Sequence, residues 1–151
     1  MSSFTESVER VIAAPPDAIF DLLADPTRHR EIDGSGEVRD AKQGSQRLAL
    51  GDTFGMAMNA GFNYSMVSTV IELDENRRIA WQTRPPGFLA HLLGGRIWRY
   101  ELEPVDGGTR VRETWDLSEE KGKSIVWRGR HSKAVASMQG TLERIEEVVT
   151  R

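Results

Sequence analysis

Tyr100 and Glu113 are the residues of this sequence whose types and spacing point most directly to chemistry. They lie in two strand-like segments that flank the turn sequence Pro-Val-Asp-Gly-Gly, a pattern typical of a β-hairpin. If Leu102 pairs with Val111, Tyr100 faces Glu113 on the apolar side of this hairpin. A carboxyl group buried there has a raised pKa and suits a general acid or base. A neighbouring phenol can donate a hydrogen bond to a substrate carbonyl or to the carboxylate itself.

A second interpretation of this pair needs no ligand. Glu113 would reach the rim of the sheet or pair with an arginine such as Arg96, and Tyr100 would pack in the core. The same register places Trp98 opposite Trp115 on the apolar face, so large aromatic groups surround the pair under either interpretation. The sequence alone leaves both interpretations open.

Aromatic and methionine side chains alternate along several other strand-like segments, as in Phe54, Tyr64, Met66 and Trp81. Such side chains line pockets for flat or flexible apolar ligands, and they fill ordinary cores equally often. If a pocket exists, the ligand-contacting residues that we predict are Phe54, Tyr64, Met66, Trp81, Phe88, Trp98, Tyr100, Glu113, Trp115, Met138 and Leu142.

The three histidines lie far apart in the sequence, and none has the spacing of a metal site, so we expect neither a metal nor another cofactor. We expect His29 at the surface, because it stands among charged residues. His131 begins the predicted final helix. His91 lies in the apolar patch 88–93, between proline and glycine breakers. This patch forms either a lid, with His91 as a third candidate for catalysis, or an exposed helical turn, which we favour.

Composition excludes several classes of function. The 151 residues fit a single domain over 1–151, and the net charge of −3 argues against a nucleic-acid partner. The chain has no apolar run of the roughly 20 residues that a membrane-spanning helix needs, so we expect no integral membrane association. It has no cysteine, and residues 1–6 lack the pattern of a signal peptide, so we expect a cytoplasmic location.

The element that must position these side chains is a C-terminal helix over 131–150. Its apolar residues recur at helical spacing and form one stripe, which consists of Val135, Met138, Leu142, Ile145 and Val149. Upstream, the pattern predicts two short helices near 16–24 and 27–32, and seven strands near 7–12, 37–42, 53–60, 62–73, 78–84, 96–103 and 109–117. Hairpin connections with the helices gathered on one side indicate the α+β class.

Several stretches resemble the polyketide cyclase/START-like superfamily, also called the Bet v 1-like or helix-grip fold. The first helix, 15–26 (Pro-Pro-Asp-Ala-Ile-Phe-Asp-Leu-Leu-Ala-Asp-Pro), resembles the family's first helix, and the other matching stretches are 70–74, 78–81, 100–104, 108–111 and the terminal helix. The resemblance implies a curved antiparallel sheet of about seven strands around the long C-terminal helix, with an apolar cavity between them. The superfamily has no shared catalytic motif.

Three functions follow as hypotheses. The first is a non-enzymatic protein that binds a small hydrophobic ligand, such as a lipid or an aromatic or polyketide-like metabolite, in that cavity. The second is a polyketide cyclase or dehydratase that uses an acid or base of the cavity. The third is an interaction module with a filled core, as in the chaperone-activator branch of the superfamily. The oligomeric state is open between a monomer and a homodimer.

Overall fold

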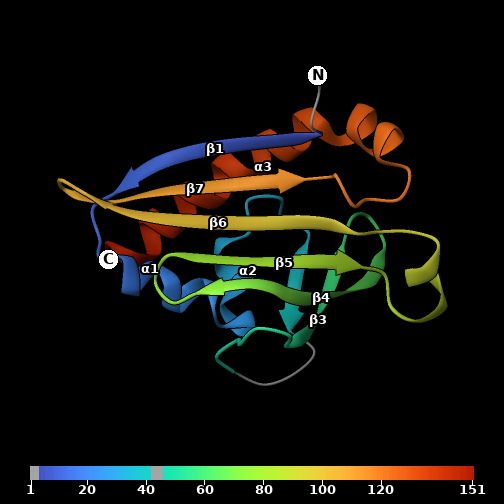
Figure 1. Cartoon of the computed structure of the whole chain (residues 1–151), viewed down its shortest axis with the longest axis horizontal. Coiled ribbons are helices and arrows are strands. Elements are labelled where there is room, and N and C mark those ends of the chain that lie inside the picture. Colours follow the sequence, from blue (N-terminus) through green and yellow to red (C-terminus); the bar gives the residue numbers. More distant parts are fainter. Residues whose placement is uncertain (1–3, 42–45) are drawn as a thin grey trace.

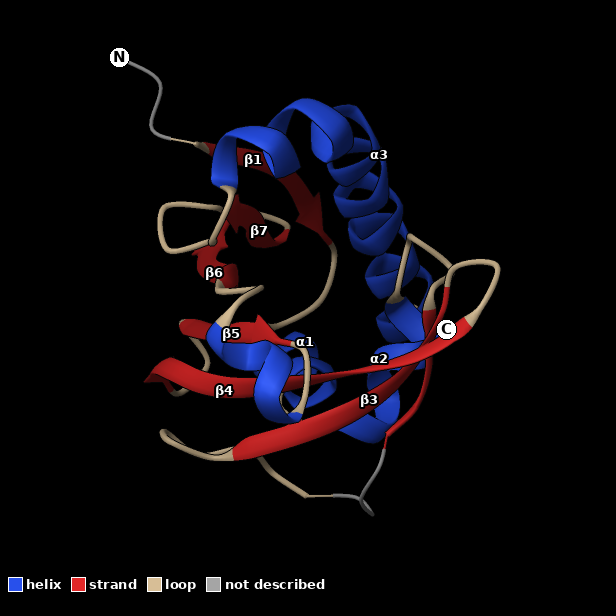
Figure 2. Ribbon diagram, turned by 90° about the vertical axis from the view of Figure 1, so that its right-hand side faces the viewer, coloured by secondary structure: helices blue, strands red, loops and turns tan. Residues whose placement is uncertain are grey.

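Seven strands form one antiparallel sheet that curls around a long C-terminal helix, as the sequence predicts (Figures 1 and 2). The computed structural model describes residues 4–41 and 46–151. The order of the strands across the sheet is β1-β7-β6-β5-β4-β3-β2, so β1 and β2 are its two edges. The strands are β1 (Thr5–Ile12), β2 (Val38–Ala41), β3 (Thr53–Asn59), β4 (Asn63–Asp74), β5 (Arg78–Arg84), β6 (Arg96–Val105) and β7 (Gly108–Asp116).

The helical elements occur in three places. Between β1 and β2 lie α1 (Pro16–Leu23), the 3-10 turn η1 (Pro26–Arg28) and α2 (His29–Ile32); η2 (Gly87–His91) links β5 to β6, and α3 (Lys123–Val149) follows β7. Pro15 and Pro16 suit the start of α1, because the first turn of a helix needs no backbone donor there. The side chain of Asp25 accepts a hydrogen bond from the Thr27 backbone amide and so caps η1.

The final helix begins earlier than the sequence pattern indicates. It starts at Lys123 rather than His131, directly after Gly122, whose φ of +72° lies in the left-handed region. The first turns are rich in basic residues and interrupted by Gly129, so they carry no apolar stripe from which their helical state can be recognised. The segment 1–6 and the predicted strand 37–42 extend outside the described part of the chain.

The hydrophobic core lies where the C-terminal half of α3 crosses the sheet. The stripe residues Met138, Leu142 and Ile145 are fully buried there, together with Ile19 and Leu23 of α1. Burial of a large apolar side chain stabilises a fold by about 1.5–3 kcal/mol, so this half of the helix is firmly held. Among the described helices, none is both long and apolar enough to cross a membrane.

The opposite end of the molecule is built differently. Because the strands are antiparallel and follow one another as hairpins from β3 onwards, the β3–β4 turn, the β5–β6 connection and the β7–α3 connection all lie at the same end of the sheet (Figure 1). We call this the β3–β4 end and define it by residues 59–63, 84–96 and 117–133. Most of the first eleven residues of α3 are exposed, whereas the second half of the helix is buried on one face.

Candidate functional site

The last hairpin has the predicted register. Tyr100 lies opposite Glu113, Trp98 opposite Trp115, and Leu102 opposite Val111. The neighbouring strands extend these rows: Ile79 of β5 is aligned with Tyr100. The two polar groups thus lie in the middle of the concave face, between apolar rows on either side.

Tyr100 and Glu113 contact each other directly. The Tyr100 hydroxyl donates a hydrogen bond of 2.8 Å to Glu113 Oε2, and both residues are buried. The other carboxyl oxygen, Oε1, is buried and has no hydrogen-bond partner within the described part of the chain. The alternative pairing of Glu113 with Arg96 is wrong, because the Arg96 guanidinium donates to Glu120 Oε1 at 3.1 Å.

Burial governs the proton equilibria of this pair. It raises the pKa of Glu113 to about 8, with a smaller contribution from the negative charge of Asp33, while the hydrogen bond from Tyr100 acts in the opposite direction. Burial and the charge of Glu113 likewise raise the pKa of Tyr100 well above its ordinary value. Glu113 therefore retains its proton at neutral pH. Since Oε2 accepts from Tyr100, this proton belongs on Oε1, which is buried and has no acceptor among the described residues.

An aromatic cluster extends from this pair toward α2. The Trp81 ring lies 5.6 Å from the Tyr100 ring, 5.6 Å from the Phe54 ring, and 4.9 Å from the His29 ring, on which it stacks. Glu113, Tyr100, Trp81 and Phe54 were all predicted to contact a ligand, and the structure brings them together in one contiguous cluster.

The surface position expected for His29 is wrong. The side chain is buried, and its Nε2 lies 2.9 Å from the Leu23 carbonyl oxygen, to which it donates in the neutral ring. Desolvation lowers the pKa of His29, which keeps the ring neutral. The α2 helix is too short for its periodicity to stand out. The available signal was the three-residue spacing to Ile32, which is also buried and shares one helical face with His29.

The concave face is covered unevenly. Val70, Ile79 and Val111 are fully buried on the α1 side of the sheet. Trp98 and Met66 also face inward, yet they are only half-buried, although Trp98 belongs to a strand well inside the sheet. The half-buried inward positions lie toward the β3–β4 end and are Met58, Tyr64, Met66 and Trp98. At that end, α3 covers the sheet incompletely.

The N-terminal half of α3 is attached to the sheet mainly by polar and aromatic contacts, with few apolar side chains against the core. Buried Glu37 accepts hydrogen bonds from Tyr64 Oη at 2.8 Å and from Arg130 Nη2 at 3.3 Å, and its carboxylate lies 2.7 Å from Lys133 Nζ. At the other sheet edge, His131 Nε2 lies 2.7 Å from Glu6 Oε2. Two carboxylates, one from each edge of the sheet, thus hold the helix. Nothing in the sequence pattern indicated this arrangement.

A stack of rings lies between these two attachments. Trp127 of α3 stacks on Trp115 of β7 with ring centroids 5.6 Å apart, and His131 stacks on Trp127 at 4.3 Å. Trp115 is fully buried, and its indole nitrogen has no hydrogen-bond partner among the described residues. Trp115, one of the residues predicted to contact a ligand, therefore lies beneath the N-terminal turns of α3.

The remaining predicted residues lie in two other elements, η2 and α3. Phe88 and His91 lie in η2, where Phe88 is 74% exposed, so the patch is the exposed turn that we favoured. Met138 and Leu142 of α3 are fully buried and belong to the same hydrophobic core as Trp81 and Tyr100. No group of three or more acidic, histidine or cysteine side chains is arranged to hold a metal within 4–41 and 46–151.

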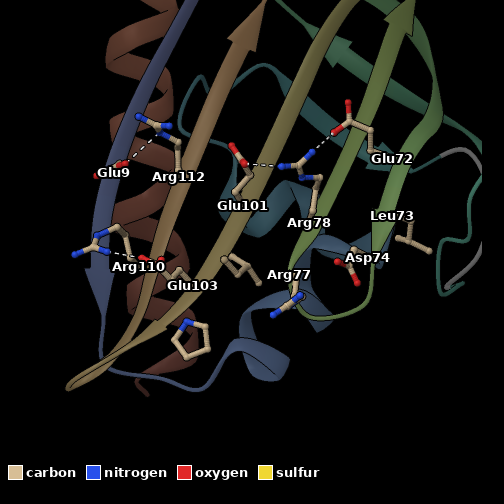
Figure 3. Close-up of a pocket in the computed structure, with 12 residues that line it drawn as sticks. Glu9, Glu72, Leu73, Asp74, Arg77, Arg78, Glu101, Glu103, Arg110 and Arg112 are labelled. Atoms are coloured by element: carbon tan, nitrogen blue, oxygen red, sulfur yellow. Dashed lines mark hydrogen bonds and ion pairs between the residues drawn. The ribbon is translucent and has the colours of Figure 1, made fainter.

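Two surface pockets lie away from Tyr100 and Glu113, although Tyr64 lines the smaller one. The larger, about 660 Å³, lies on the outer face of the sheet and is lined mainly by charged side chains (Figure 3). There Arg112 pairs with Glu9 at 3.1 Å and Arg78 with Glu101 at 2.9 Å. The smaller, about 270 Å³, lies at the β2–β3–β4 edge. Neither is lined by a residue of α3, so neither is the cavity that the helix-grip resemblance implies.

Comparison with protein families matches residues 1–150 to the family described as polyketide cyclase / dehydrase and lipid transport. The chain belongs to this family. Among curated proteins, 114 residues are 40% identical to the uncharacterized protein Rv0088 of Mycobacterium tuberculosis, a match that covers 74% of this chain and 46% of that protein. The chain thus spans about half the length of the curated relatives that it matches.

Solved structures confirm the fold of this family member. Protein CV1439 from Chromobacterium violaceum has a TM-score of 0.76 at 19% identity, and the match covers 99% of both chains. Protein NE0264 from Nitrosomonas europaea has a TM-score of 0.77 at 15% identity, covering 99% of this chain and 97% of that one. At these identities the likeness concerns the fold alone.

Proposed function

We propose that this chain binds a small hydrophobic molecule on the concave face of its sheet, beneath the N-terminal half of α3. The observation that carries the proposal is the incomplete burial of inward-facing apolar groups there, above all Trp98 and Met66. Apolar surface left in contact with water is stabilised by about 25 cal/mol per Å² when a ligand covers it. The family description, which names lipid transport beside cyclase and dehydrase activities, supports a ligand of this class.

Glu113 and Tyr100 supply the polar contact in this proposal. They lie one row deeper than Trp98, and Glu113 Oε1 has no hydrogen-bond partner among the residues that the structure describes. In its protonated form Glu113 donates to an acceptor such as a carbonyl oxygen, so the ligand is an apolar molecule with a carbonyl or similar group. Because Oε1 is buried, the side chains beneath the start of α3 must shift to admit the ligand.

A fluorescence titration with Nile red, a neutral apolar probe, tests the binding surface. We expect saturable binding to the wild-type protein and at least roughly fivefold weaker binding to the Trp98→Ala variant, since the variant loses about 1 kcal/mol or more of apolar contact. The matched control is Val11→Ala, which truncates an apolar side chain on the outer face of β1. Equal affinities for wild type and Trp98→Ala, or no saturable binding, would refute the proposal. The latter result would favour the interaction module with a filled core.

A polyketide cyclase or dehydratase is the second candidate, and the retained proton of Glu113 favours it. A buried acid whose pKa is near 8 can protonate or polarise a carbonyl oxygen while a bound chain is held in a reactive conformation. A small-molecule ligand identified by native mass spectrometry provides the substrate for the test. Glu113→Gln should then abolish turnover and leave the affinity nearly unchanged; full turnover by the variant would exclude Glu113 as the catalytic acid.

A further inference from the structure

Exposed apolar side chains gather at the β3–β4 end of the molecule. The described part of the chain exposes eight large hydrophobic side chains, and six of them belong to this end: Phe62, Phe88, Leu89, Leu92, Leu93 and Ile125. The other two are Val11, near the far end of β1, and Leu50, on the connection into β3. Phe88 and Ile125 are the most exposed of all, at 74% and 75%. Such a concentration marks an interaction surface.

Two of the connections that carry these side chains lie against each other. The Lys121 backbone amide donates to the Gly94 carbonyl at 3.0 Å, and the Lys121 ammonium donates to the His91 carbonyl. The exposed turn η2 and the segment that leads into α3 are therefore neighbours, and the β3–β4 turn with Phe62 lies at the same end of the sheet (Figure 1). The six exposed side chains thus belong to three connections at one end of the sheet.

The charge of this end is opposite in sign to that of the chain. The β3–β4 end carries seven lysine and arginine residues and two glutamates, although the chain as a whole has a net charge of −3. Lys121, Lys123 and Arg128 are exposed within it. Basic groups interleaved with protruding apolar groups are the composition of surfaces that dock on anionic membranes.

We propose that the β3–β4 end docks on the surface of an anionic lipid bilayer. Phe88, Leu92 and Ile125 insert among the acyl chains near the headgroups, while Lys123 and Arg128 contact lipid phosphates. A bilayer fits better than a protein partner, because the exposed apolar groups are spread over three separate connections and are interleaved with basic groups. A fluid surface receives such protrusions wherever they fall, whereas a protein would need a matching pocket for each. This inference does not depend on the proposed ligand site.

Vesicle flotation tests the docking surface. Vesicles of phosphatidylcholine with phosphatidylglycerol should carry the wild-type protein to the top of the gradient, and vesicles of phosphatidylcholine alone should carry much less. Added salt should weaken the binding. Phe88→Ser combined with Leu92→Ser should reduce the bound fraction on anionic vesicles at least about tenfold. Leu50→Ser, a comparably exposed leucine outside the surface, is the matched control and should bind as the wild type does.

The charge contribution is tested separately. Lys123→Gln combined with Arg128→Gln should weaken the affinity for anionic vesicles by roughly fivefold per removed charge. Arg110→Gln, at the other end of the sheet, should leave it unchanged.

Three results would overturn the proposal: no binding to anionic vesicles, equal binding to both kinds of vesicle, or self-association in solution that Phe88→Ser with Leu92→Ser abolishes. The last would identify the surface as a contact between two copies of this chain. Nile red binding, measured in the same variants, reports on the ligand site alone. Either proposal can therefore be refuted while the other stands.

Discussion

Tyr100 donates its only hydroxyl proton to one oxygen of Glu113, at 2.8 Å, while the second oxygen of the same buried carboxyl has no partner in 4–41 or 46–151. A buried carboxylate that accepts only one hydrogen bond is unfavourable in free energy, so the protonated carboxyl is the more stable form. The buried Glu113 carboxyl group therefore keeps its proton at neutral pH. This property can be measured without knowledge of the ligand, because it links the stability of the fold to pH.

We predict that Glu113 makes the protein less stable as the pH rises. The folded-state pKa of about 8 lies above the ordinary value of 4.5, so the folded state binds the proton more tightly than the unfolded state does. The contribution is fully present below pH 4.5 and is lost as the pH rises through 8. It amounts to a few kcal/mol, on the order of 1.4 kcal/mol per pH unit at most. Urea denaturation at a series of pH values measures it.

The matched variant for this prediction is Glu113→Gln. Glutamine has the same shape, can accept the hydrogen bond from Tyr100 and does not titrate, so its stability should depend less on pH between 4.5 and 8. If wild type and variant show the same slope across this interval, Glu113 does not hold a proton in the folded protein.

His29 should act in the opposite direction. Burial against Trp81 lowers the folded-state pKa of His29 below its ordinary 6.5, so below that pH the unfolded state binds a proton that the folded state does not. The stability contributed by neutral His29 is present above pH 6.5 and is lost as the pH falls. His29→Gln, which retains a donor for the Leu23 carbonyl, should remove this acid-side loss. A loss of the same size in the His29→Gln variant would show that other groups cause it.

The contact between Tyr100 and Glu113 and the position of His29 show which parts of the site could be predicted from the sequence. Strand register is fixed by which side chains can face the core, so the alternation of β6 and β7 predicted the contact between Tyr100 and Glu113 correctly. His29 was misplaced because its burial depends on where α2 packs, against Trp81 of β5, and a four-residue helix has no periodicity that reveals this. The charged residues beside His29 suggested an exposed side chain, but the packing of α2 against β5 buries it.

The attachment of α3 shows the same limit. The stripe through Met138 and Leu142 predicted the buried half of the helix, because a core contact requires apolar residues at helical spacing. The other half is held by Glu37 and Glu6, two acceptors from opposite edges of the sheet. Ion pairs between segments so distant in sequence leave no local pattern, and the full extent of the helix could not be predicted for that reason.

Glycine substitutions probe the closest contact between α3 and the segment after α2. A Cβ atom on Gly34 would lie 2.2 Å from the Ser137 carbonyl oxygen and 2.5 Å from the Thr141 amide nitrogen, both backbone atoms of α3. The helix must move to admit it, so Gly34→Ala should destabilise the protein by about 3 kcal/mol in urea denaturation. Its control is Gly129→Ala. That residue lies in α3 with nothing within 4 Å of its added Cβ, so the change should stabilise the protein by about 0.5–1 kcal/mol. Destabilisation of equal size by both changes would contradict this account of the crossing.

We predict that Glu37 holds residues 123–133 of α3 against the sheet. Burial opposes its charge, but hydrogen bonds from Lys133 and Tyr64 and the charge of Arg130 outweigh burial and lower the pKa of Glu37. Glu37→Gln removes the charge that holds both cations, so we expect a loss of about 2 kcal/mol in stability. We also expect faster hydrogen exchange of the backbone amides in 123–133, because this half of α3 has few apolar contacts to hold it.

The control for this prediction is Glu103→Gln, which removes a carboxylate from an exposed pair with Arg110 at the other end of the sheet. Exposed pairs contribute about 0–1 kcal/mol, so exchange in 123–133 should not change. Amides around Met138 and Leu142 should stay protected in both variants, since the apolar core holds them independently of Glu37. Uniformly faster exchange along the whole of α3 in Glu37→Gln would show instead that the helix opens as one unit, and that Glu37 does not act as a local closure over the site.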